Sequence, residues 1–170
     1  MPDRRFYMRL RVLHVEDDEG IGELVEKLLD LSYLDMHLQR VTTLQEGIDL
    51  LYQQRWDVIL LDLTLPDSAP KDTFQEVYKI APQLPIVVLT AETDIEIRAA
   101  TIAMGAQDCI DKIELSATPN LLARTLRFAV ERQRTILELQ EIIRELELSK
   151  KKLQELIEQV DDSLDPSIKH

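Results

Sequence analysis

The feature that most constrains the fold is a regular alternation of short apolar runs with segments of helical period. The apolar runs fall at residues 11–15, 36–41, 57–61, 85–90 and 107–110. Such alternation is typical of β-α units around a parallel sheet. The third and fourth runs, DVILL and PIVVLT, are apolar enough to be strands covered on both faces. We therefore predict an α/β fold with a five-stranded, doubly wound parallel sheet that binds ligands at the carboxyl ends of its strands.

The length of the chain leaves room for an extension beyond this domain, and its composition excludes several classes of function. The chain has 170 residues, only 4 glycines and a formal net charge of -12, which disfavours direct nucleic-acid binding. Its basic N-terminus lacks the apolar segment of a secretion signal, and no run approaches the ~18 apolar residues of a membrane helix. The single cysteine, Cys109, cannot form an internal disulfide, so a cytoplasmic location is expected.

Carboxylates follow two of the predicted strands. Glu16, Asp17 and Asp18 come directly after the first run, and Asp62 follows four apolar residues of the third. If these strands are neighbours, their ends gather three or four carboxylates at one edge of the sheet, where unpaired charges would repel one another. A hard divalent cation such as Mg²⁺ removes that repulsion. The sequence therefore indicates a magnesium site at this edge.

Two further strands end in residues that suit phosphate chemistry. Thr90 ends the fourth run and supplies a hydroxyl, and Lys112 follows the fifth and supplies a cation. Each residue alone has an ordinary structural explanation: an acidic helix start, a β-branched strand residue, a surface lysine. Their joint placement at four strand ends instead favours phosphoryl transfer to an aspartate.

These segments resemble the receiver domains of two-component response regulators over about residues 9–132. VLHVEDDE resembles the family's acidic strand end, VILLDLTLPD its phospho-acceptor strand, PIVVLTA its hydroxyl strand and GAQDCIDK its lysine strand. The resemblance implies a flavodoxin-like fold and a phosphorelay switch. Such a switch is not an enzyme beyond promoting its own phosphorylation and dephosphorylation.

The resemblance also implies a role for each site residue. Asp62 would accept the phosphoryl group from a histidine kinase or phosphotransfer protein. Asp17, Asp62 and the Thr64 carbonyl would bind Mg²⁺ directly, and Glu16 would act through water. Thr90 and Lys112 would contact the phosphoryl oxygens, with Thr90 also moving in the switch.

Two residues depart from the family pattern. Cys109 occupies the switch position three residues before Lys112, where family members usually carry Tyr or Phe. Ile113 follows Lys112 in place of the usual proline, which removes the expectation of a cis peptide there. Both changes bear on output coupling more than on the acceptor chemistry.

A long helix is predicted from Thr118 as N-cap and Pro119 as first helical position to Asp165-Pro166, with only its first turns covering the sheet. It carries heptads. Their a positions are Ile136, Ile143, Lys150 and Ile157, and their d positions are Leu139, Leu146, Leu153 and Val160. Ile at a and Leu at d favour a parallel homodimer, and Lys150 fixes the register. Ile142 and Leu156 at g leave a four-helix contact open, and a single amphipathic helix on another domain is the alternative.

The predicted organisation is a receiver at 9–132, a coiled coil at 133–164 and a tail at 165–170. The chain shows no recognisable effector motif, so the expected output is a downstream domain or partner reached through the coil. One rival interpretation is a receiver fold that no longer switches and only presents the coil. A hydrolase with an aspartyl-phosphate intermediate is less suited, because such phosphatases usually carry a second Asp where this chain has Thr64.

Overall fold

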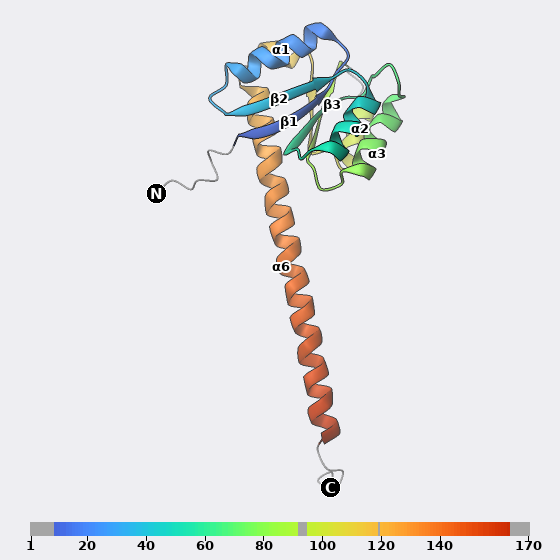
Figure 1. Cartoon of the computed structure of the whole chain (residues 1–170), viewed down its shortest axis with the longest axis vertical. Coiled ribbons are helices and arrows are strands. Elements are labelled where there is room, and N and C mark those ends of the chain that lie inside the picture. Colours follow the sequence, from blue (N-terminus) through green and yellow to red (C-terminus); the bar gives the residue numbers. More distant parts are fainter. Residues whose placement is uncertain (1–8, 92–94, 119, 164–170) are drawn as a thin grey trace. The chain divides into compact units, whose positions relative to one another are not determined.

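The computed structural model describes residues 9–91, 95–118 and 120–163. Five strands alternate with helices along the chain (Figure 1). The elements are β1 (Leu10–Val15), α1 (Glu19–Asp30), β2 (Met36–Val41), α2 (Leu44–Gln53), β3 (Val58–Asp62), α3 (Pro70–Ile80), β4 (Ile86–Thr90), α4 (Ile95–Ala103), β5 (Asp108–Asp111), α5 (Glu114–Ala117) and α6 (Leu121–Ser163). None of the helices within these described ranges is both long and apolar enough to cross a bilayer.

The sheet has the order β2-β1-β3-β4-β5, and all its strands are parallel. Every residue of β3 and β4 is buried, because apolar cores cover both faces. One core joins the sheet to α1 and the start of α6, and the other joins it to α2 and α3 (Figure 1). The predicted doubly wound parallel sheet is confirmed, and each strand begins within one residue of the predicted position.

The start of the last helix differs from the prediction. Thr118 is the C-cap of α5: its backbone is extended, and its N–H donates to the Glu114 carbonyl oxygen at 3.2 Å. Asn120 has a φ of 62°, so α6 begins only at Leu121. A Thr-Pro pair fits a helix start, but here the threonine closes the preceding short helix. Pro119 and the predicted end at Asp165-Pro166 lie outside the described residues.

The described residues divide into two compact units, one up to Gln133 and one from Arg134 onward. In the first unit, the opening turns of α6 cover the sheet as predicted, through Leu122, Ala123, Leu126, Ala129 and Val130. In the second unit, the a and d side chains of the heptads form an exposed apolar stripe. Its apolar members are 42–63% exposed: Ile136, Leu139, Ile143, Leu146, Leu153, Ile157 and Val160.

Candidate functional site

Four strand ends bring the predicted site residues to one edge of the sheet. Glu16 directly follows β1, Asp62 ends β3, Thr90 ends β4, and Lys112 directly follows β5. Parallel register keeps these ends level, since Asp62 lies opposite Leu89. The backbone N–H of Lys112 donates to the Thr90 carbonyl oxygen at 2.8 Å, so β4 also fixes the start of the lysine loop.

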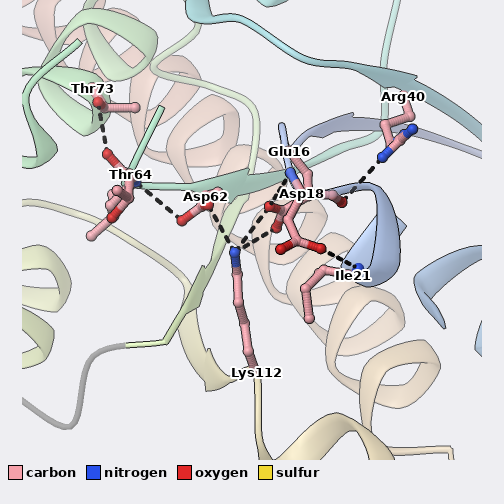
Figure 2. A network of polar contacts seen from close by, with 9 residues as sticks. Glu16, Asp18, Ile21, Arg40, Asp62, Thr64, Thr73 and Lys112 are labelled. Carbon is pink, nitrogen blue, oxygen red and sulfur yellow. Dashed lines mark hydrogen bonds and ion pairs between the residues drawn. The ribbon is translucent and has the colours of Figure 1, made fainter. Parts of the chain in front are cut away.

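Lys112 connects the two buried carboxylates of the site (Figure 2). Its Nζ lies 2.8 Å from Asp62 Oδ2, 3.0 Å from Glu16 Oε1 and 2.8 Å from Glu16 Oε2. Burial alone would lower the pKa of Lys112, but hydrogen bonds to Asp62 and Glu16 outweigh it and raise the pKa. The ammonium group is therefore kept charged beside Asp62.

Glu16 has no exposed surface, and burial raises its pKa to about 7. Lys112 opposes this rise, whereas the nearby charge of Asp62 adds to it. The contact of Glu16 Oε2 with Lys112 is an ion pair without hydrogen-bond geometry, so this buried oxygen has no hydrogen-bond partner among the described residues. It is an acceptor site that a water or a hydrated cation can satisfy.

The carboxylates can hold a metal ion together. One oxygen from each of Glu16, Asp17 and Asp62 lies within 4.8 Å of the others, and Asp17 is exposed while the other two are buried. Carboxylate oxygens with open coordination positions toward solvent are the ligands Mg²⁺ prefers, because it retains several waters. The donor set and the Glu16 oxygen that lacks a hydrogen bond therefore fit Mg²⁺.

Hydrogen bonds to Leu63 and Thr64 hold the start of the loop after β3. The Thr64 N–H donates to Asp62 Oδ1 at 3.1 Å, and the Thr73 hydroxyl donates to the Leu63 carbonyl oxygen at 3.0 Å (Figure 2). Farther along, Asp67 accepts the N–H groups of Leu44 and Gln45 at 2.9 and 3.0 Å, at the start of α2. The loop after β3 is thus tied to both α3 and α2.

The Asp67 contact gives an expected pH dependence of stability. Desolvation alone would raise the pKa of Asp67, but the hydrogen bonds from Leu44 and Gln45 hold it below its usual 3.8. A carboxyl whose pKa is lower when folded stabilises the fold above its unfolded pKa, and that stability is lost as pH falls through the folded pKa. We expect Asp67→Ala to lower the free energy of unfolding by about 1 kcal/mol near pH 7.

Urea denaturation of Asp67→Ala and wild type checks this expectation. The difference between their free energies of unfolding should become smaller below about pH 4. Glu26→Ala is the control, because it removes an exposed carboxylate from the middle of α1. A gap that stays equal at low and neutral pH would contradict the capping role of the Asp67 carboxylate.

Cys109 lies on β5 and packs in the core shared with α2 and α3. Burial raises the pKa of its thiol, while Arg98 opposes the rise and Asp108 and Asp111 add to it. Burial is the largest of these effects on the thiol pKa, and the two carboxylates add less to it. Arg98 also donates to the Cys109 carbonyl oxygen at 3.1 Å, which ties α4 to β5.

Three contributors to the site were not singled out from the sequence: Arg40, Gly22 and Asp67. Arg40 Nη1 donates to the Asp18 carbonyl oxygen at 3.2 Å, across the first turn of α1 (Figure 2). Gly22 is buried directly beneath the guanidinium. A glycine inside a helical pattern is unfavourable and signals a packing reason, so Gly22 was the one available hint.

Comparison with known proteins gives an independent view of the same region. The family model of the response regulator receiver domain matches residues 12–124. The transcriptional regulatory protein QseB of Escherichia coli O157:H7 is 31% identical over 119 residues, which are 68% of this chain and 53% of QseB. The cell cycle transcriptional regulator CtrA of Caulobacter vibrioides is 31% identical over 103 residues, or 61% of this chain and 44% of CtrA. The chain thus spans about half the length of these relatives.

The fold of this chain is similar to that of a solved structure. The response regulator receiver domain protein of CheY type from Methanospirillum hungatei JF-1 has a TM-score of 0.63 and 20% sequence identity. The match covers 75% of this chain and 98% of that chain. The complete receiver fold of that protein therefore corresponds to three quarters of this one.

Proposed function

We propose, on the premise that this chain belongs to the response regulator receiver domain family of two-component systems, that Asp62 accepts a phosphoryl group from a histidine kinase or a phosphotransfer protein. The observation that carries the proposal is the position of Lys112. Its Nζ bonds the carboxylate of Asp62 at 2.8 Å, within the carboxylate cluster of Glu16, Asp17 and Asp62. A carboxylate nucleophile beside a fixed cation and a metal-binding acid pair suits phosphoryl transfer.

Each residue has a defined task in the proposed transfer. An oxygen of Asp62 forms the new bond to phosphorus as the bond from phosphorus to the donor breaks, and the donor leaves with that electron pair. Lys112 stays charged and stabilises the phosphoryl oxygens, and the Thr90 hydroxyl binds another of them. Mg²⁺ held by Asp17, Asp62 and the Thr64 carbonyl, with Glu16 acting through water, would supply the remaining neutralising charge.

Acetyl phosphate with Mg²⁺ tests the proposal directly. We expect one phosphoryl group per chain by intact-protein mass spectrometry, and no labelling when the metal is chelated. The same measurement separates the proposal from a non-switching scaffold that only presents the coil, an alternative favoured by Cys109 at the switch position. A wild-type chain that stays unlabelled with Mg²⁺ present would support the scaffold instead.

Magnesium should also stabilise the unphosphorylated protein. Ligand binding to the folded state adds RT ln(1 + [L]/Kd), which is about 1.4 kcal/mol at ten times Kd. We expect millimolar Mg²⁺ to raise the melting temperature, measured by calorimetry against sodium chloride of equal ionic strength. Asp17→Ala should remove this shift and raise the stability of the metal-free protein, since it relieves carboxylate repulsion.

Glu23→Ala is the matched control, because it removes an exposed carboxylate from α1 outside the cluster. It should leave the shift unchanged. A melting temperature that millimolar Mg²⁺ does not move in the wild type would count against the acidic pocket as a metal site.

The output is proposed to pass through the second unit of the chain. A parallel dimer that pairs the exposed stripe from Ile136 to Val160 would hold two receivers at the same end of a coil. Phosphorylation at Asp62 would pull Thr90 and reorganise the segment after β4. Because Cys109 is smaller than the usual aromatic residue, we propose a modest change in receiver packing within a dimer that the coil already maintains. A downstream domain or partner would read this change.

A further inference from the structure

Arg40 makes an unusual crossing from the sheet to the loop that carries Asp17. It lies near the end of β2, half buried, and its Nη1 reaches the Asp18 carbonyl oxygen at 3.2 Å (Figure 2). The residues between these two partners include all of α1, so the contact joins segments 22 positions apart. Arg40 therefore restrains the loop from the side opposite Lys112.

Gly22 creates the space for this crossing. A Cβ built on Gly22 would lie 2.0 Å from Arg40 Nη1, 2.6 Å from Cζ and 2.8 Å from Cδ. These separations are far below any real carbon contact, so a side chain at this position must displace the guanidinium. The glycine disfavours the helix, and the path of Arg40 is the feature that accounts for it.

Hydrogen bonds involve the N–H, the carbonyl oxygen and the side chain of Asp18. Its N–H donates to Glu16 Oε1 at 3.1 Å, and its carbonyl oxygen accepts from the Gly22 N–H at 2.9 Å as well as from Arg40 at 3.2 Å. Its side chain accepts the Ile21 N–H at 2.9 Å. Asp17 lies between Glu16 and Asp18, so its peptide group is fixed at both ends. Lys112 in turn holds Glu16.

We infer that Arg40, running over Gly22, is a positioning residue that fixes the loop of residues 16–18 so that Asp17 faces the metal position. The inference rests on the proposed function and deepens it. Charge alone predicts the opposite effect, because a guanidinium close to an acidic pocket repels a cation. Removing Arg40 should therefore tighten Mg²⁺ binding if only its field matters, and weaken it if its hydrogen bond positions the loop.

The test compares Arg40→Met, Gly22→Ala and the double variant with the wild type. Methionine keeps much of the packing of Arg40 without its charge or donors. Alanine leaves Arg40 in the chain and favours the helix, so this variant should fold even if the first does not. In the double variant no guanidinium remains for alanine to displace.

Two readouts are independent of phosphorylation. Hydrogen exchange of the Asp18 amide in metal-free protein should accelerate in both single variants. The Kd for Mg²⁺, measured by titration calorimetry on unphosphorylated protein, should rise roughly tenfold in each. Adding Gly22→Ala to Arg40→Met should change neither quantity further. As a third readout, the Mg²⁺ concentration for half-maximal labelling by acetyl phosphate should rise while the rate at saturating Mg²⁺ stays within about twofold.

Several outcomes would overturn the positioning role. These are tighter Mg²⁺ binding by Arg40→Met, unchanged exchange and Kd in both single variants, or a full effect of Gly22→Ala when Arg40 is absent. The proposed function fails separately: a wild type that binds Mg²⁺ but takes no phosphoryl group refutes it and leaves the positioning role standing. Labelling of all the variants with wild-type Mg²⁺ dependence would refute the positioning role alone.

Discussion

Asp62→Asn is expected to abolish labelling by acetyl phosphate, with a loss of at least about a hundredfold in rate. The amide is a poor nucleophile, and it also loses the ion pair to Lys112 that keeps the acceptor and the cation 2.8 Å apart. Among the described residues, no other carboxylate both ends a fully buried strand and bonds Lys112. Labelling rates are followed by intact-protein mass spectrometry with Mg²⁺ in excess.

Asp67→Asn is the matched control, because it makes the same chemical change on the loop that follows Asp62 but at the contact with α2. It should still be labelled. Glu16 is the carboxylate that could replace Asp62, since it also bonds Lys112. An Asp62→Asn protein labelled at the original rate would show that the acceptor is elsewhere, and peptide mapping would then locate it.

The strand ends could be predicted from the sequence because the fold itself brings them together. A parallel sheet with β1 beside β3 and β4 beside β5 must place Asp62, Thr90 and Lys112 at one edge, whatever the details of packing. The periodicity that identifies the strands is short-range, so no knowledge of tertiary contacts was needed. This is why the strand positions and the carboxylate cluster agree with the structure.

The contacts that support the cluster could not be predicted in the same way. Arg40 and Asp67 meet partners 22 and 23 positions away through individual side-chain paths, which hydrophobic periodicity does not encode. The hydrogen bonding of His14 could not be predicted from the sequence either. Its burial in β1 follows from the pattern, but a core histidine ordinarily has a hydrogen-bond partner, and here neither ring nitrogen has one among the described residues. Burial, then Arg40 and Lys112, lower the pKa of His14 to about 3, so the ring is neutral.

The other prediction with a large expected effect concerns the exposed stripe of the second unit. Replacing Leu146 and Leu153 by glutamate should convert the proposed dimer to a monomer at micromolar concentration. Burying one leucine contributes about 1.5–3 kcal/mol, and a dimer contains both leucines twice, so the loss exceeds about 6 kcal/mol. That is a more than roughly ten-thousandfold rise in Kd. Light scattering measures the mass directly.

A control must add the same charge to the same helix without touching the stripe. Leu148 and Gln159 lie at heptad positions f and c, and Leu148 is 53% exposed, close to the 63% of Leu146 and the 58% of Leu153. Changing Leu148 and Gln159 to glutamate should therefore leave the dimer intact. The comparison removes net charge and helix propensity as explanations, because both double variants gain two glutamates in the same element.

This experiment should also separate phosphate acceptance from dimerisation. The cores that place Asp62 are built from residues up to Val130, and the stripe begins at Ile136, so the Leu146 and Leu153 variant should fold its receiver and accept phosphate at the wild-type rate. A dimer that survives the double change would rule out the coil as the principal interface. A monomer that no longer accepts phosphate would mean that acceptor chemistry depends on the second copy, which the separate cores argue against. A labelled monomer would assign phosphate acceptance to the first unit and pairing to the second.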